Sequence, residues 1–353
     1  MTWTKQRLNN LFFLLGCAAC VVMLFTFDVS FVELWEHITH AGYWLIPIVG
    51  IWLLVYGLNA MAWLAVIKGN VGKEEIVSRQ LSSPRFFWRI YRLTITGYAL
   101  NYATPVGGLG GEPYRIMELS KNIDKEHATS SVILYAMMHF FAHFWFWFIS
   151  IFIYLALVVV GDMPINTAIA TVLGIIVLFC LLAFYVFSKG YRHGLVLYVL
   201  GLLGKVPGLR GWCRRFQERH NDTLQNIDAQ IAALYAQDTR AFYTSLVLEY
   251  FSRVVQSLEV MFMLLLFGID CGGGLSGLTL TYLHSLLIVS FTTLFANLIG
   301  FLPMQLGVQE GGFVLSIAAL GLSAALGIFV SIICRVREII WIIIGIGLMK
   351  LKN

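Results

Sequence analysis

The chain has 353 residues, of which 59% are hydrophobic, 14% aromatic and only 12% charged, and its formal net charge is +5. This composition is typical of a protein with several membrane-spanning helices and excludes an ordinary soluble domain. Because no segment is polar enough to fold separately, we expect a single integral membrane domain over residues 1–353. The six cysteines lie mostly in apolar stretches, so we interpret them as packing residues rather than as a disulfide framework.

Apolar stretches long enough to cross a bilayer, which takes about 17–25 residues, recur along the chain. The first, near 9–27, is expected to be a retained helix, because no small-residue cleavage site follows it. The others lie near 41–67, 131–160, 166–187, 241–268, 278–302, 313–333 and 337–350. The sequence therefore predicts an all-α polytopic membrane protein with about eight transmembrane helices.

Basic residues predict the orientation of these helices. Of the 24 Lys and Arg residues, 21 lie in the N-terminus, 68–92, 115–125, 189–240 and the C-terminus. The intervening segments 28–40, 161–166 and 269–276 contain none. Since Lys and Arg concentrate in cytoplasmic loops, we expect both termini to be cytoplasmic and the protein to lie in the cytoplasmic (inner) membrane.

The segment between 68–92 and 115–125 must then enter and leave on the same side. It is too short to cross the membrane twice, so we expect a re-entrant hairpin with Pro105–Gly111 near its tip. Non-helical backbone at membrane depth is tolerated where it is buried in protein or lines a wet cavity.

The long segment 189–240 is predicted to be a basic cytoplasmic loop that contains an amphipathic helix over 222–236. Apolar residues recur there at helical spacing between Leu224 and Leu234, with Asp228 assigned to the polar face. Such a helix would lie on the protein or on anionic lipid headgroups of the inner leaflet. The alternative is an ordinary positive-inside loop.

Two short segments resemble one another and interrupt apolar stretches. The first runs from Asn101 to Arg115, and the second from Asn297 to Gly312. In each, an Asn precedes a Pro, glycines follow, and a Glu lies seven residues after the Pro. Paired helix breaks at corresponding positions of two halves indicate a transporter's binding site. They favour an inverted pseudo-repeat, with the second segment entering from the opposite face.

The candidate substrate-binding residues come from these motifs and from cations inside apolar stretches, where charges are rare and usually functional. They are Asn101, Gly110, Gly111, Glu112, Arg115, Arg253, Asn297, Gly307, Glu310 and Arg335. The arginines are predicted to hold an anionic phosphate headgroup, because guanidinium binds phosphate in a bidentate fork. The two glutamates would contact a cationic or hydroxylated headgroup part, or a coupling proton.

Some charged and polar residues also have structural interpretations. Arg253 follows Glu249 by four residues and could simply form a structural ion pair with it. Arg337, beside Glu338, is interpreted as marking a membrane boundary. His139 and His143 are interpreted as interior hydrogen-bonding residues, because no third ligand accompanies them. The glycine run at Gly107–Gly111 lacks the Gly-Lys-Ser/Thr ending of a nucleotide-binding loop, so no cofactor is predicted. Because the two histidines have no third ligand, no metal is predicted either.

The two motifs, together with the block Cys334-Arg335-Val-Arg337, resemble the flippase-like transmembrane domain of lysylphosphatidylglycerol synthases and its stand-alone relatives. Taken with the order and spacing of these blocks, the resemblance covers the chain from about residue 10 to 350. The resemblance implies a lipid translocase fold with re-entrant elements. In fused relatives this domain moves an aminoacylated phospholipid between leaflets. The sequence ends at Asn353 without the soluble synthase domain, so we expect no lipid-aminoacylating activity.

The leading hypothesis is a translocase that moves a phospholipid or lipid-linked headgroup between leaflets. It would be passive or ion-coupled, and we find no catalytic constellation beside the motif glutamates. The alternatives are a membrane-embedded enzyme on a lipid-linked substrate, and a scaffold that recruits a lipid-modifying partner through 189–240. No nucleic-acid partner is expected. Gly321 and Gly327 offer a small-residue helix face, which leaves open internal packing or a homodimer.

Overall fold

The computed structural model describes residues 42–103, 110–193, 195–205, 210–237, 239–269, 271–299 and 307–349. The regular elements in these ranges are all helices. The predicted span 9–27 and the segments around Pro105 and Pro303 lie outside the described residues.

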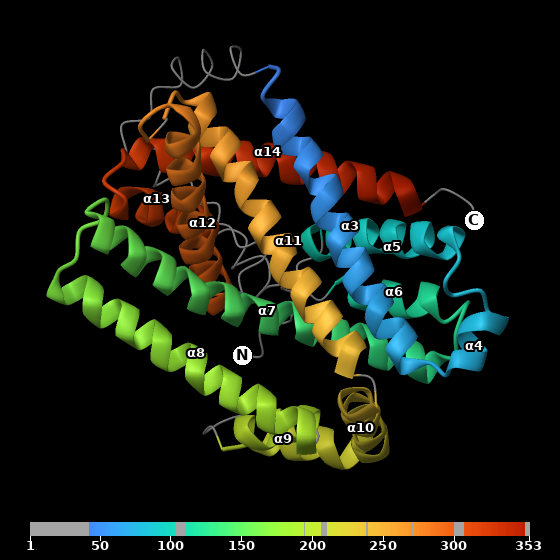
Figure 1. Ribbon diagram of the computed structural model, residues 1–353. Coiled ribbons are helices and arrows are strands. Elements are labelled where there is room, and N and C mark those ends of the chain that lie inside the picture. Colours follow the sequence, from blue (N-terminus) through green and yellow to red (C-terminus); the bar gives the residue numbers. More distant parts are fainter. Residues whose placement is uncertain are drawn as a thin grey trace, which may run out of the picture.

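The helices pack side by side and across one another in a single bundle (Figure 1). They are α3 (Leu45–Asn70), α4 (Lys73–Ser78), α5 (Pro84–Ala103), α6 (Glu112–Leu119), α7 (Lys125–Val160), α8 (Thr167–His193), α9 (Leu195–Leu203), α10 (Arg210–Gln237), α11 (Thr239–Leu266), α12 (Gly274–Leu298), α13 (Val308–Ala319) and α14 (Ala324–Met349). Among the described residues, α3, α7, α8 and α12 are long and apolar enough to cross a membrane. The prediction of an all-α, multi-pass membrane protein is confirmed at this level.

The C-terminal helices differ from the sequence prediction. We expected two spans, 313–333 and 337–350, with Arg335 and Arg337 between them. Instead, α13 ends at Ala319 and α14 is one continuous helix that carries both arginines near its middle. The chain turns at Gly321, whose φ of 76° favours glycine. No break is needed at the arginines because their charges are paired inside the protein.

Each motif connects two antiparallel helices. In the first pair, the end of α5 meets the start of α6 through Asn101 and Glu112, while Arg115 reaches back to Thr94. In the second pair, Thr292 of α12 and Ser316 of α13 are hydrogen-bonded at 3.1 Å. The predicted helix breaks are therefore present, and the first motif lies in a helical hairpin. Its re-entrant position in a membrane stays a prediction.

Helix α14 contacts both hairpins through glycines. A Cβ atom at Gly327 would lie 2.6 Å from Cα of Val314 on α13, and one at Gly345 would lie 3.2 Å from the carbonyl oxygen of Ile95 on α5. Missing side chains at these points let the backbones approach closely. The charged stretch from Arg335 to Glu338 thus lies between the two contacts. Gly327 serves internal packing.

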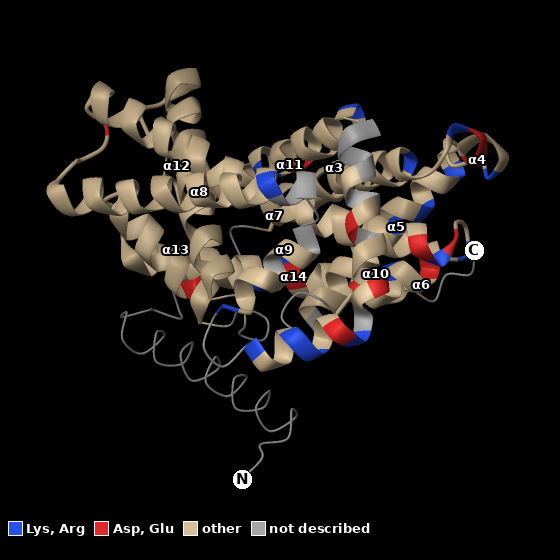
Figure 2. Cartoon of the chain, turned by 90° about the horizontal axis from the view of Figure 1, so that it is seen from below, with Lys and Arg blue, Asp and Glu red and all other residues tan. Residues whose placement is uncertain are grey.

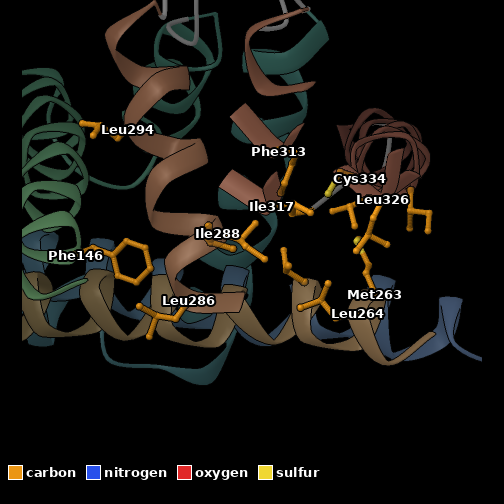
Figure 3. Close-up of a cluster of buried hydrophobic side chains, with 14 of the residues drawn as sticks. Phe146, Met263, Leu264, Leu286, Ile288, Leu294, Phe313, Ile317, Leu326 and Cys334 are labelled. Atoms are coloured by element: carbon orange, nitrogen blue, oxygen red, sulfur yellow. The ribbon is translucent and has the colours of Figure 1, made fainter. Parts of the chain in front are cut away.

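A large apolar core joins α7, α11, α12, α13 and α14 (Figure 3). Phe146, Met263, Ile288, Phe313 and Ile317 are among its buried residues. Because lipid is as apolar as these side chains, helices in a bilayer are held together mainly by close packing and buried polar contacts. This core fixes the second hairpin against α14.

Segment 189–240 is largely helical, with α10 packed against α8, α9 and α11. Leu224 is buried, as the amphipathic pattern predicts. Asp228, which we assigned to the polar face, is also buried, and its carboxylate accepts a hydrogen bond from the Leu197 N–H at 2.9 Å. It supplies an acceptor to the first turn of α9, where N–H groups lack partners within the helix. Figure 2 shows charged residues gathered on α4, α6 and α10, whereas the part around α8, α12 and α13 is mostly uncharged.

Candidate substrate site

The first motif closes on itself through Asn101 and Glu112. The Asn101 side chain donates to Glu112 Oε1 at 3.3 Å and accepts from the Gly111 N–H at 2.6 Å. Arg115 Nη1 donates to the same Glu112 oxygen at 3.0 Å. A side chain at Gly111 would collide with the backbone of Gly97, so glycine is needed for α6 to lie this close to α5. Gly110 lies in the turn just before α6.

Arg115 is almost fully buried, with 2% of the residue exposed. Its guanidinium lies over the rings of Trp63, Tyr98 and Tyr135, at 5.6, 4.9 and 5.6 Å from their centroids. Cation–π attraction of this kind is strongest where water is excluded. Together with Glu112, these rings hold the guanidinium in one place.

A second group of polar residues links α7 to α11. Glu249 is completely buried, and its Oε2 lies 2.8 Å from His139 Nδ1 and 3.7 Å from Arg253 Nη2. The Tyr98 hydroxyl lies 3.2 Å from the same His139 nitrogen, which connects this group to Arg115. His143 Nδ1 lies 3.0 Å from the His139 carbonyl oxygen. Both histidines are interior hydrogen-bonding residues, as we predicted, and the Glu249–Arg253 pair is present.

The second motif reaches across to α14. Glu310 lies in the first turn of α13, where its Oε2 accepts from the Gly307 N–H at 2.8 Å and its Oε1 accepts from Arg335 Nε at 2.7 Å. Gly307 has a φ of 80°, which a residue with a side chain rarely adopts. Arg335 also donates to Glu338 at 2.7 Å. The motif glutamate is therefore an ion-pair partner of a cation on another helix.

Arg337 does not lie at a helix boundary. It is 3% exposed and donates from Nε and Nη2 to the two carboxylate oxygens of Glu259, at 2.7 and 3.2 Å. Trp52 donates its ring N–H to Glu259 at 2.8 Å, and the Arg337 guanidinium lies 4.0 Å from the Trp52 ring centroid. Our placement of Arg337 between two spans is wrong, because α14 continues through it and α11 supplies a buried carboxylate.

Aromatic residues of α3 and α5 lie between the two motif regions. The Tyr56 ring is 5.5 Å from the Tyr98 ring and 4.9 Å from the Trp341 ring. The Tyr56 ring also lies 5.4 Å from the Trp52 ring, which faces the Arg337 guanidinium. A chain of aromatic and polar contacts therefore links the two motif regions.

Most predicted site residues take part in this region, but Asn297 does not. Its side chain donates to the Thr293 carbonyl on its own helix at 2.8 Å. Sequence reasoning gave no role to Trp52, Tyr98 or Glu259, and it considered Glu338 only as the neighbour of Arg337 at a boundary. The two glutamates carried a usable signal, because each is an acid in a largely apolar helix.

Together, the ion pairs described above join five glutamates (Glu112, Glu249, Glu259, Glu310 and Glu338) to four arginines (Arg115, Arg253, Arg335 and Arg337). This leaves one excess negative charge when all nine side chains are ionised. Several buried atoms of these side chains have no hydrogen-bond partner among the described residues: Glu112 Oε2, Glu249 Oε1, Arg115 Nε and Arg253 Nε. Buried polar atoms are nearly always satisfied in native proteins. Such atoms therefore offer contacts to water or to a ligand.

A comparison with known families places the chain in context. The family model described as "Lysylphosphatidylglycerol synthase TM region" matches residues 13–347, nearly the whole chain. No curated protein and no solved structure matches the chain. The family resemblance stated from the motifs is confirmed.

Proposed function

This chain belongs to the family of the lysylphosphatidylglycerol synthase TM region, and we propose that it is a lipid translocase. It would move a phospholipid or lipid-linked headgroup between the leaflets of the cytoplasmic membrane, with both termini on the cytoplasmic side. The observation that supports the proposal is that each motif glutamate, Glu112 or Glu310, forms an ion pair with an arginine, and that aromatic residues of α3 and α5 link the two pairs.

The exchange of ion-pair partners gives a physical route for a charged headgroup. An incoming phosphate would bind Arg115 or Arg335 in place of Glu112 or Glu310. The released carboxylate would then contact a cationic or hydroxylated part of the headgroup, or take up a proton. A charge in hydrocarbon is strongly unfavourable, whereas here each charge keeps a partner at every stage. The acyl chains would stay in lipid.

The energetic coupling follows from the same exchange. With no proton taken up by the released carboxylate, transport is passive and runs down the gradient of the lipid. With a proton taken up on one side of the membrane and released on the other, transport is coupled to the proton gradient. No chemical step at the motif glutamates is required in either case, so the proposal describes a transporter rather than an enzyme.

Leaflet exchange in liposomes tests the proposal. The purified protein is reconstituted with fluorescent lipids of several headgroups, and exchange is measured by quenching the outer leaflet. Wild type is compared with the double variant Glu112→Gln/Glu310→Gln. The matched control is Glu218→Gln, which removes a carboxylate from the exposed Arg214–Glu218 pair on α10, with 2.8 Å between the charged atoms.

We expect headgroup-selective exchange that the double variant loses and the control keeps. Exchange that is unchanged in the double variant would place the site elsewhere. A lack of exchange for every lipid, with and without an ion gradient, would reject the translocase.

A further inference from the structure

A second polar constellation lies outside the proposed site. It consists of Cys271, between α11 and α12, His284 on α12 and Asp162, just after α7. His284 Nδ1 lies 3.4 Å from Cys271 Sγ, and His284 Nε2 lies 2.7 Å from Asp162 Oδ2. The proposed translocation uses none of these residues.

Local structure fixes all three positions. Gly161, with a φ of 85°, ends α7 and turns the chain so that Asp162 follows at once. Thr281 Oγ1 accepts the Cys271 N–H at 3.2 Å, which folds the glycine-rich loop back along the first turns of α12. His284 is only 7% exposed, so its ring is held between the thiol and the carboxylate.

This order of groups is the one used to activate a thiol. One imidazole nitrogen faces the thiol and takes its proton, while the other is oriented by a carboxylate that stabilises the resulting imidazolium. The thiolate is the reactive form of cysteine. A purely structural role, in which His284 and Asp162 only tie two loops together, would leave the reactivity of Cys271 independent of His284.

An apolar cavity lies one helical turn along α12 from His284, although none of the three polar residues lines it. Its volume is about 420 Å³, and it is lined by residues of α7, α8, α12 and α13 that include Ile151, Val172, Leu287 and Leu294. This volume lies within the range of about 300–1,000 Å³ typical of ligand sites. Leu287 is one helical turn beyond His284, and it packs in the same cluster as Met163, the neighbour of Asp162.

The outer wall of this cavity is apolar as well. Helix α8 is the least buried of the four candidate spans, and it exposes Val172, Ile175 and Leu178. Its outer face therefore suits contact with lipid chains. A long hydrocarbon chain matches both the lining of the cavity and its surroundings.

We propose that Cys271 is an acyl-accepting thiol, and that the cavity holds the chain of a fatty acyl ester or thioester while its carbonyl carbon meets Cys271 Sγ. His284 takes the thiol proton, and the sulfur attacks the carbonyl carbon to form a C–S bond. The bond from this carbon to the leaving oxygen or sulfur then breaks, and the leaving group receives the proton from His284. The products are S-acyl-Cys271 and a free alcohol or thiol, with no change in oxidation state.

The test uses the full-length protein in lipid nanodiscs with palmitoyl-CoA and acetyl-CoA as probes. Mass spectrometry follows the peptide that contains Cys271, and release by hydroxylamine identifies the thioester. Cys213, a buried cysteine on α10, serves as an internal control. The variants are Cys271→Ser, His284→Gln and Leu287→Trp, the last of which narrows the cavity and keeps all three polar residues.

We expect a palmitoyl adduct on Cys271 in wild type, and none on Cys213. His284→Gln should slow its formation about 10²-fold or more, the usual contribution of a positioned base. Leu287→Trp should slow palmitoylation but not acetylation. The alkylation rate of Cys271 with iodoacetamide, measured in variants that retain wild-type elution in size-exclusion chromatography, should fall in parallel in His284→Gln.

Three results would overturn the proposal. The first is the absence of an acyl adduct on Cys271 with either donor. The second is a rate that His284→Gln leaves unchanged, because the thiol would then react without the imidazole. The third is equal reactivity with acetyl and palmitoyl donors, because the cavity would then have no role.

Discussion

The Glu259–Arg337 pair allows a quantitative test of whether a buried ion pair supports structure or transport. The side chains of Glu259 and Arg337 are 2% and 4% exposed. In Glu259→Met, the nearest remaining carboxylate oxygen to the Arg337 guanidinium is that of Glu338 at 3.8 Å, and Glu338 already pairs with Arg335. Removing one partner of a buried pair costs about 3–5 kcal/mol. We expect Glu259→Met and Arg337→Met each to destabilise the protein by roughly that amount.

The double variant Glu259→Met/Arg337→Met should be more stable than either single variant, because no uncompensated buried charge remains. It should still fall short of wild type by about 1–3 kcal/mol, since Trp52 loses its hydrogen-bond acceptor. Arg214→Met, which breaks an exposed pair, is the matched control, with an expected cost of about 0.2–1 kcal/mol. Unfolding is followed by tryptophan fluorescence in detergent micelles.

Leaflet exchange measured on the same variants separates the two roles. We expect the double variant to keep exchange, whereas Arg335→Met, which removes the partner of Glu310, should lose it. A double variant no more stable than the worse single variant would refute the reasoning on buried charge. Single variants as stable as the exposed control would refute it equally.

Three further predictions concern helix ends and the first motif. Gly111→Ala should abolish lipid exchange in the liposome assay, because the added Cβ would collide with the backbone of α5. Gly311→Ala is the control and should keep exchange, because nothing lies within 4 Å of its Cβ. Arg115→Lys should also lose exchange, because an ammonium cannot reproduce the planar guanidinium contacts with three aromatic rings, and thermal stability should fall with it. Asp124→Ala should cost about 1 kcal/mol, because its carboxylate caps α7. Partial burial opposes a lower pKa of Asp124, but hydrogen bonds from His127 outweigh it, so the pKa lies below its ordinary value. The cap should therefore make wild type more stable than Asp124→Ala above a pH of about 4, and this difference in stability should vanish as the pH falls through the lowered pKa. Melting temperatures of the two proteins, measured against pH, test this. A difference in melting temperature that persists in strong acid would contradict the capping role.

Much of the helical architecture could be predicted from the sequence, because helices and their ends depend on neighbouring residues. The apolar stretches predicted α3, α7, α8 and α12, because a membrane-spanning helix must be apolar over most of its length. Glycines and the glutamates in the first turn marked the starts of α6 and α13, since helix ends depend on a few neighbouring residues. The same local signals identified both motifs and the family.

Only the tertiary structure decided which charges meet across different helices. Glu259 and Arg337 are 78 positions apart, and His139 and Glu249 are 110 apart, so no spacing along one helix reveals these pairs. The same holds for Asp162 and His284, which are 122 positions apart. Their partners are set by how helices cross, which depends on close contacts such as that of Gly327 with α13. The sequence by itself determined most of the helices and where charge enters them, because both follow from neighbouring residues. Packing across helices determined how that charge is neutralised, and this is why α14 continues through its two arginines.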